Sequence, residues 1–137
     1  MQIREIMSPE VKLVSPDDSL QWAAQLMEEI DSGALPVGEN DRLVGMLTDR
    51  DIAIRAVAKG KRPDRCKVRD VMSSEVKYVY DDETVEDAAR NMGNHQVRRL
   101  PVLNRQKRLV GIVSLADLAA GSTDDAGGAL HDISEVR

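Results

Sequence analysis

Two short motifs combine a hydroxyl and a carboxylate at the same spacing. Thr48 stands three residues before Asp51, and Ser114 stands three residues before Asp117. We expect each hydroxyl at the end of a strand and each carboxylate in the first turn of the following helix. A helix N-terminus offers free N–H groups to a phosphate, and a carboxylate there can accept hydrogen bonds from two vicinal hydroxyls, as on a ribose. The spacing is also that of a capping box, so helix capping and ligand binding are both open at this point.

Two adjacent arginines form a second candidate site for phosphate. Arg98 and Arg99 come immediately before a predicted strand. Much of the sequence is one unit that occurs twice, and the equivalent positions of its first copy hold Gly33 and Ala34. The repeated fold therefore does not require arginine at these positions. The planar fork of arginine donors suits phosphate recognition. The alternative is a solvated charge pair that stabilises the end of a helix.

No residue pattern typical of catalysis is present in the sequence. The only histidines are His95 and His131, the only cysteine is Cys66, and they do not have the spacing of zinc ligands. The G-x-S-x-G, P-loop and G-x-G-x-x-G motifs are also missing. We therefore expect a protein that is not an enzyme and has no resident metal. A metal- or redox-responsive module that uses these three residues is an alternative.

The residues around the two motifs belong to one sequence unit that occurs twice. The offset is 65 positions before the hairpin turn and 66 after it, because the second turn is one residue longer. The matching segments are 3–8 and 68–73, 10–12 and 75–77, 35–37 and 100–102, and 43–48 and 109–114. We divide the chain into a first repeat at 1–60, a linker at 61–67, a second repeat at 68–121 and a tail at 122–137. Each repeat alone is small for an independent core, so we expect the two to pack together about a pseudo-twofold axis.

The expected elements of each repeat are strand, helix, strand, strand, helix, which gives an α+β fold. In the first repeat these are a strand at 11–14, a helix at 20–30, a hairpin of 34–37 and 43–48, and a helix at 49–59. The first helix is indicated by an apolar stripe from Leu20 to Ile30, with Gly33 as a stop. The second helix is expected to end at Gly60.

Composition and charge exclude several classes of protein. The net charge is −5 and the isoelectric point is about 5.0, which argues against a nucleic-acid partner. No apolar stretch approaches the roughly 20 residues that cross a bilayer, and the N-terminus does not resemble a signal peptide. The single cysteine excludes an internal disulfide. We expect a soluble cytoplasmic protein with no membrane partner.

Taken together, the repeated motifs resemble paired cystathionine-β-synthase (CBS) domains, often called a Bateman module. Both repeats contain M-S-x-x-V, an amphipathic helix rich in Leu, Ala and Met, L-P-V, and L-V-G-[MI]-[LV]-[ST] followed by x-x-D. The resemblance extends from about residue 3 to residue 121. The chain is similar to small stand-alone CBS-pair proteins of bacteria, including the hypoxic response proteins.

The resemblance implies adenosyl ligands in clefts between the two repeats. These ligands are AMP, ADP, ATP, NAD(H) or S-adenosylmethionine. By the family pattern, Thr48 and Asp51 would hold the ribose and phosphate of one ligand, and Ser114 and Asp117 those of the other. Backbone groups at four further positions would meet the adenine edge: Val11, Ala34, Val76 and Arg99.

The resemblance also implies that the two sites differ. Arg98, Arg99 and His95 would reach the phosphates of the Asp51 site, with Arg50 assisting. Ala116 stands where the Asp117 site would need an arginine like Arg50. We therefore predict that the Asp51 site binds phosphate more strongly.

We expect the chain to be a regulatory module that senses an adenine nucleotide and signals to an unidentified partner protein. CBS pairs commonly dimerise, so a homodimer is expected. Besides the metal- or redox-responsive module, the alternative is a dimeric interaction or scaffold module that binds no ligand.

Overall fold

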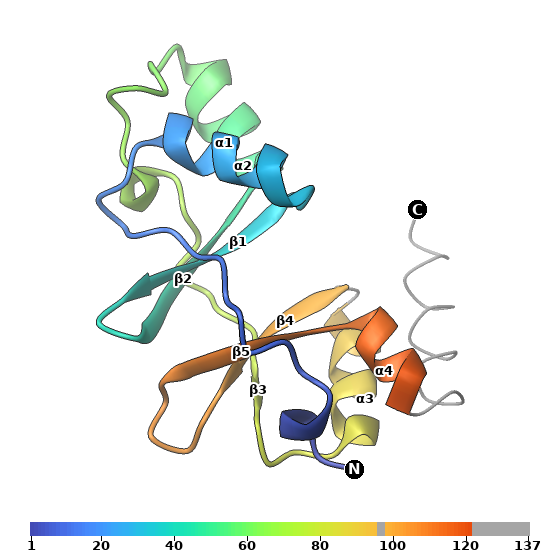
Figure 1. The fold of residues 1–137 in the computed structure, drawn as a ribbon. Helices are drawn as coiled ribbons and strands as arrows, with labels where there is room; N and C mark the ends of the chain where they lie inside the picture. The colour runs from blue at the N-terminus through green and yellow to red at the C-terminus, as the bar shows by residue number, and fades with distance from the viewer. Residues whose placement is uncertain (96–97, 122–137) are drawn as a thin grey trace. The chain divides into compact units, whose positions relative to one another are not determined.

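The structure, a computed structural model, describes residues 1–95 and 98–121 (Figure 1). The chain forms two compact units. The first, which we call the Thr48 unit, is Lys12–Val76. The second, the Ser114 unit, combines Met1–Val11 with the described part of Lys77–Arg137. Neither unit coincides with one sequence repeat, because each contains a segment of both. The predicted tail at 122–137 lies outside the described residues.

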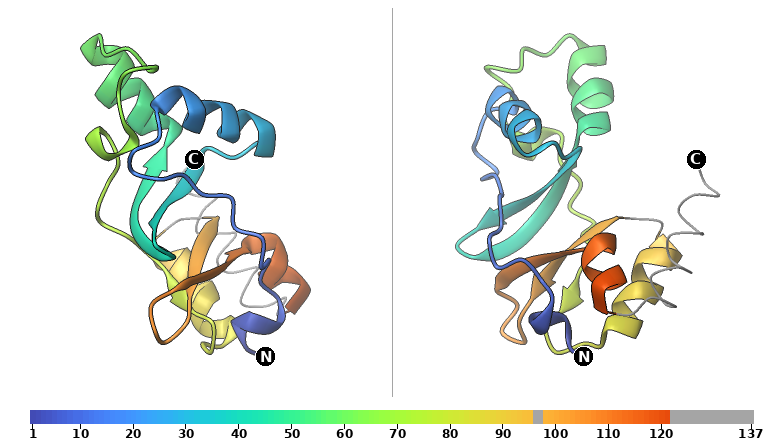
Figure 2. Two further views of the ribbon diagram at one scale, coloured as in Figure 1. Left: turned by 60° about the vertical axis from the view of Figure 1, so that its left-hand side comes forward. Right: turned by 45° about the vertical axis from the view of Figure 1, so that its right-hand side comes forward.

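Both units are built from the same kinds of element, as expected for an α+β fold of repeated units. The Thr48 unit contains α1 (Leu20–Ile30), β1 (Ala34–Glu39), β2 (Arg42–Thr48), α2 (Asp49–Asp51), η2 (Ile52–Ala56), η3 (Val57–Lys59) and η4 (Val68–Asp70). The Ser114 unit contains η1 (Ile3–Glu5), β3 (Val79–Tyr80), α3 (Val85–His95), β4 (Arg99–Leu103), β5 (Leu109–Ser114) and α4 (Leu115–Gly121). The helices α3 and α4 lie side by side within their unit in both views of Figure 2.

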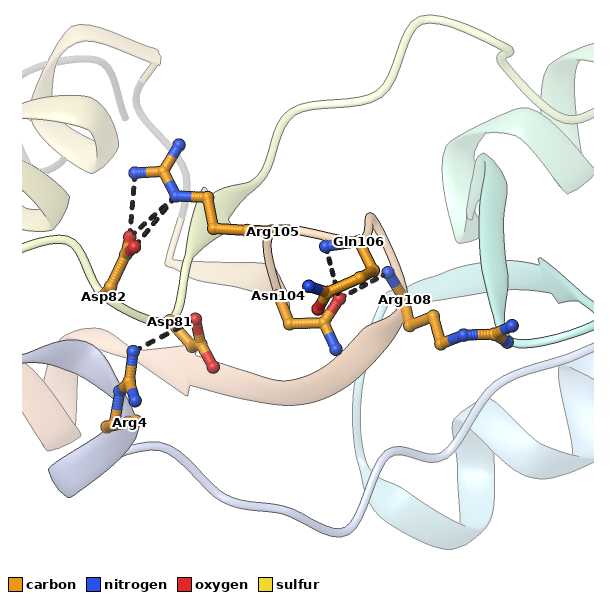
Figure 3. A network of polar contacts seen from close by, with 7 residues as sticks. All are labelled: Arg4, Asp81, Asp82, Asn104, Arg105, Gln106 and Arg108. Carbon is orange, nitrogen blue, oxygen red and sulfur yellow. Dashed lines mark hydrogen bonds and ion pairs between the residues drawn. The ribbon is translucent and has the colours of Figure 1, made fainter.

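The two predicted hairpins are confirmed, and their turns explain the one-residue slip between the repeats. Strands β1 and β2 are antiparallel and joined at Asn40 and Asp41, which have φ angles of 54° and 64°. Left-handed residues at both positions are typical of a two-residue hairpin turn. The longer turn between β4 and β5 is held by Asn104, whose Oδ1 accepts hydrogen bonds from the backbone N–H groups of Gln106 and Arg108, both at 3.0 Å (Figure 3).

The two predicted helices of the first repeat are also confirmed, with the predicted bounds, although the C-cap of the first and the interior of the second differ from expectation. Ser19 caps the start of α1 by accepting a hydrogen bond from the backbone N–H of Trp22. The helix ends at Ile30, and the left-handed residue that follows it is Asp31 and not the predicted Gly33. The second helix runs through α2, η2 and η3 and ends at Lys59. The next residue, Gly60, is left-handed with a φ angle of 73°. Its middle part, η2, is π-helical.

The predicted strand at 11–14 is wrong. Only Val14 pairs there, through a single parallel bridge to Val37. Its backbone N–H donates to Pro36 O at 3.1 Å, and its carbonyl accepts from Gly38 N at 2.9 Å. Val11 is the last residue of its segment in the Ser114 unit, so the chain leaves one unit for the other where the strand was expected. The matching strand in the second repeat, β3, is two residues long.

The beginning of each repeat packs into the core of the unit that holds the other repeat's hairpin. We call residues 1–11 and 68–76 the exchanged segments. Ile3 is fully buried against the core of the Ser114 unit, and Val68 and Val71 are buried in the core of the Thr48 unit. The backbone bonds match as well, since Ile3 N donates to Glu83 O and Val68 N donates to Asp18 O, both at 2.9 Å.

A glycine on each hairpin allows the exchanged segment to lie across the strand. Ser73 and Met46 exchange two backbone hydrogen bonds of 2.9 Å, and Ser8 pairs with Ile112 in the same way. A Cβ at Gly45 would lie 2.7 Å from Met72 Sδ and 2.8 Å from Ser73 O. The equivalent distances at Gly111 are 2.6 Å to Met7 Sδ and 2.8 Å to Ser8 O. The M-S motif of each repeat therefore packs directly against the L-V-G motif of the other repeat.

Ion pairs fasten the exchanged segments at the surface. Arg69 donates to Asp17 Oδ1 through Nη2 at 2.6 Å and Nε at 3.0 Å, and Arg4 lies 3.6 Å from Asp81 (Figure 3). The hydrogen bonds from Arg69 hold the pKa of the Asp17 carboxyl below its usual value. Arg105 lowers the pKa of the Asp82 carboxyl in the same way, and its guanidinium lies 4.0 Å from the centre of the Tyr80 ring.

We expect Gly45→Ala to destabilise the protein by about 1–3 kcal/mol, because the new methyl group overlaps a backbone carbonyl that is fixed by its own hydrogen bonds. Gly38→Ala is the control and should cost less than about 1 kcal/mol. Its Cβ would lie 3.3 and 3.4 Å from the movable methyl groups of Leu13, and 3.6 Å from Arg42 O, which is an ordinary van der Waals distance. Urea unfolding of both variants measures the difference. Equal destabilisation by the two substitutions would contradict the close crossing at Gly45.

We expect Arg69→Gln to raise the pKa of Asp17 toward its ordinary value of about 3.9 and to leave that of Asp82 unchanged. A lowered carboxyl pKa stabilises the fold above the unfolded-state pKa, and this contribution is lost as the pH falls through the folded-state pKa. The free energy of unfolding of the variant should therefore fall less than that of the unsubstituted protein as the pH drops from about 4 to the folded-state pKa of Asp17. Carboxyl NMR titration measures both residues at once. An unchanged Asp17 pKa would show that Arg69 does not hold it.

Candidate functional site

The first hydroxyl and carboxylate meet where the β1–β2 hairpin leads into a helix. Ala34 pairs with Thr48 at the end of the hairpin, and Thr48 is the N-cap of α2. The Thr48 Oγ1 accepts a hydrogen bond from Asp51 N at 3.1 Å, and Asp51 Oδ2 accepts one from Thr48 N at 2.9 Å. We call Ala34, Thr48 and Asp51 the Asp51 corner.

The second corner repeats this geometry in the Ser114 unit. Arg99 pairs with Ser114 across the β4–β5 hairpin. The Ser114 Oγ accepts from Asp117 N at 3.2 Å, and Asp117 Oδ2 accepts from Ser114 N at 2.9 Å. Leu115 N donates to Arg98 O at 3.0 Å, so Arg98 also belongs to what we call the Asp117 corner.

Both corners thus form the expected helix cap, but the cap leaves each carboxylate able to accept further hydrogen bonds. A carboxylate has about four lone-pair positions, and the cap occupies one of them. The Asp51 side chain is 17% exposed, and its Oδ1 lies 3.9 Å from Arg55 Nε. Acceptor capacity therefore remains for the hydroxyl groups of a ligand.

The cationic side chains of the site are exposed. Arg50 follows Thr48 by two residues, and Arg98 and Arg99 precede β4; all three residues are exposed. The structure places Arg98 and Arg99 beside Ser114 in the Ser114 unit. Their predicted reach to the phosphates at Asp51 would join residues of two units and stays a prediction.

The two remaining predicted positions lie where the chain passes from one unit to the other. Val11 ends a segment of the Ser114 unit and Val76 ends the Thr48 unit. Both residues are half-buried. Their role at the adenine edge also stays a prediction.

Two neighbours of the Asp51 corner were not predicted from the sequence. Asp49 lies against Gly33, where a Cβ would come within 2.7 Å of Asp49 Oδ2; the matching position of the second repeat is Leu115. Arg55 donates from Nη1 to Val71 O at 3.1 Å and to Met72 O at 3.5 Å. The sequence did contain a signal for Arg55, because it stands four residues after Asp51 and residues four apart on a helix lie on the same face.

Of the three residues considered for metal or redox chemistry, the structure describes the surroundings of Cys66. Cys66 is buried, with its Sγ 3.9 Å from Lys67 O. It lines a pocket of about 360 Å³ together with Lys61, Arg62, Arg65 and Asp70. Within 1–95 and 98–121, no three His, Cys, Asp or Glu side chains are grouped to hold a metal ion. His131 lies outside the described residues.

Comparison with known proteins shows what this arrangement is similar to. The family model described as the CBS domain matches residues 3–57 and 68–122. The CBS domain-containing protein YhcV of Bacillus subtilis (strain 168) is 46% identical over 134 residues, which cover 96% of this chain and 94% of YhcV.

Two solved structures resemble the chain over most of its length. The crystal structure of Hypoxic Response Protein I with two coordinated zinc ions has a TM-score of 0.77 and 42% identity, covering 88% of this chain and 98% of that one. The CBS domain pair of MJ0100 in complex with 5′-methylthioadenosine and S-adenosyl-L-methionine has a TM-score of 0.73 and 26% identity, covering 90% and 97%. These matches confirm the α+β fold of two repeats. Among the described residues, no helix has the length and apolar character needed to span a membrane.

We expect Thr48→Ala to destabilise the Thr48 unit by about 1 kcal/mol, because the backbone N–H of Asp51 loses its capping oxygen. Thr48→Ser keeps that oxygen and should cost much less. Urea unfolding in the absence of any ligand measures both. If the alanine and serine variants were equally stable, the hydroxyl would not be contributing a cap.

Proposed function

The chain belongs to the CBS domain family, and we propose that its two domains bind an adenosyl ligand and signal its presence to a partner protein. A pair of CBS domains is a regulatory module. The observation that carries the finer proposal is the pair of corners, each with a carboxylate that is fixed by the backbone and still able to accept hydrogen bonds. The structural relative MJ0100 holds adenosyl ligands, which supports this class of ligand.

In the proposed complexes the carboxylates recognise the ribose. Asp51 and Asp117 accept hydrogen bonds from the two ribose hydroxyls, while Thr48 and Ser114 contact the ribose and phosphate. Fixed acceptors favour binding because little conformational freedom is lost when the ligand arrives. The ligand is AMP, ADP, ATP, NAD(H) or S-adenosylmethionine.

The adenine edge is read by backbone groups near Val11, Ala34, Val76 and Arg99. Backbone donors and acceptors suit this role, since an adenine edge presents both kinds of partner.

The phosphate side of the proposal rests on the exposed arginines. Arg98 and Arg99, assisted by Arg50, bind the phosphates of the ligand at Asp51, so that site binds a phosphorylated ligand more tightly than the Asp117 site. Arginine forks form charge-assisted, often bidentate hydrogen bonds with phosphate.

Signalling requires partners, and we propose a homodimer that acts on another protein in the cytoplasm without catalysing a reaction itself. Exposed apolar side chains on the helices of the Thr48 unit support an interface: Trp22 is 55% exposed, Ile54 50% and Val57 63%. Large apolar side chains left in water favour association.

Zinc is a second candidate ligand because Hypoxic Response Protein I holds two zinc ions. The described residues of this chain show no ready cluster of ligands, so zinc binding here would need residues outside that part or a second chain. Zinc therefore belongs in any ligand screen beside the nucleotides.

We expect a thermal shift with at least one of AMP, ADP, ATP, NAD⁺, NADH and S-adenosylmethionine. A ligand at 100 times its dissociation constant stabilises by about 2.7 kcal/mol, which corresponds to roughly 5–15 °C for a protein of this size. Asp51→Asn should weaken binding of a phosphorylated ligand more than Asp117→Asn does. Asparagine is the right substitution because its side-chain oxygen can still cap Thr48 N.

Asp64→Asn is the control, since Asp64 is an exposed carboxylate that pairs with Arg62 and belongs to neither corner. No shift with any adenosyl compound would overturn the proposal and favour an interaction module. A shift with zinc alone would favour the metal-responsive module.

A further inference from the structure

Arg55 connects the Asp51 carboxylate to an exchanged segment. One end of this connection is the ion pair between Arg55 Nε and Asp51 Oδ1, at 3.9 Å. At the other end, Nη1 donates to Val71 O at 3.1 Å and Met72 O at 3.5 Å. A single planar guanidinium thus contacts both the proposed ligand-binding carboxylate and a backbone 16 and 17 residues further along the chain.

The segment that Arg55 contacts is under tight constraint on its other side. Val71 is 1% exposed in the core of the Thr48 unit. Ser73 is paired by two backbone hydrogen bonds with Met46 on β2. Met72 lies against Gly45, with no room for a Cβ between them. Because these close contacts prevent single residues from shifting independently, we expect a change at the carbonyls of Val71 and Met72 to affect the whole segment.

The location of Arg55 within its helix is also unusual. It lies in η2, the π-helical stretch Ile52–Ala56, which directly follows α2. Single π-helical turns inside helices often occur at functional sites. The second repeat has no equivalent, because Gly121 occupies the position that matches Arg55.

We propose that Arg55 is a positioning residue that couples ligand occupancy of the Asp51 corner to residues 71–76 of the exchanged segment 68–76. This inference rests on the proposed function. A ligand hydroxyl that donates to Asp51 fixes the carboxylate, the fixed carboxylate holds the guanidinium, and the guanidinium holds the carbonyls of Val71 and Met72. Ligand binding therefore steadies the segment that leads out of the Thr48 unit, and only the Asp51 corner is coupled in this way.

Hydrogen exchange of the full-length protein tests the coupling, with AMP, ATP and S-adenosylmethionine each added as probes. In the unsubstituted protein, a probe that binds should slow exchange of the backbone amides in 71–76 by about fivefold or more. The amides at 6–8 form the internal comparison, because they belong to the matching segment of the Ser114 unit, where Gly121 stands at the position that matches Arg55.

Two variants of Arg55 distinguish the effect of its hydrogen bonds to the segment from the effect of its positive charge on ligand affinity. Arg55→Lys keeps a positive charge near Asp51 but lacks the fork that reaches the carbonyls, so the probe should bind within about threefold of the original affinity while the protection of 71–76 is lost. Arg55→Gln should lose that protection and also bind less tightly. Lys59→Gln, which removes an exposed charge from the same helical run, should change neither quantity.

Each outcome decides the inference. Loss of protection at 71–76 in Arg55→Lys, with affinity retained, supports it. If a probe binds and the protection persists in both Arg55 variants, Arg55 is only a brace of the fold and the coupling is wrong. If no probe binds the unsubstituted protein, the proposed function fails and the coupling fails with it, and this result is visible before any variant is made.

Discussion

The crossing of a Met–Ser segment over a strand glycine is the contact on which the rest of the structure depends. At Gly45 and at Gly111 the two backbones approach so closely that a methyl group would overlap a carbonyl oxygen. The paired backbone hydrogen bonds of Ser73 with Met46 and of Ser8 with Ile112 satisfy groups that would otherwise lie unpaired at the edge of a hairpin. The crossing also places Ile3 and Val68 in their cores.

This exchange makes each unit dependent on both sequence repeats. About 55 residues bury little apolar surface on their own, and the borrowed segment adds buried side chains, strand pairing and a surface ion pair. The same exchange places the backbone of 71–72 next to the helix that begins at the Asp51 corner. The Asp51 corner and the packing of the exchanged segment 68–76 are therefore linked by contacts within the Thr48 unit.

In both corners the capping box also fixes the carboxylate that we propose as the ligand acceptor. The reciprocal hydrogen bonds of Thr48 with Asp51, and of Ser114 with Asp117, orient each carboxylate. An acceptor that is already oriented needs little rearrangement to bind a diol. Duplication of the unit would have copied the cap in any case, so the two corners differ in their unshared neighbours. Asp49, Arg50 and Arg55 follow Thr48, whereas Leu115, Ala116 and Gly121 stand at the matching positions after Ser114.

The sequence was informative where a pattern has a local cause. The apolar stripe of α1, the hairpin turns and Gly60 each depend on neighbouring residues, and these predictions are confirmed. The exchange of segments could not be predicted, because two similar repeats offer the same contacts within a repeat and between repeats. The strand at 11–14 was predicted from alternation alone, but pairing needs a neighbouring strand, and only Val14 has one. Arg55 was missed because its carbonyl partners are distant in sequence.

The most direct test of the central claim is to follow backbone amide NMR shifts while the protein is titrated with AMP, ATP and S-adenosylmethionine. The account predicts saturable shifts at 48–51 and 114–117, with the first set changing at lower concentrations of a phosphorylated ligand. Shifts confined to other regions, such as the basic pocket around Cys66, or no shift with any of the three compounds, would contradict it.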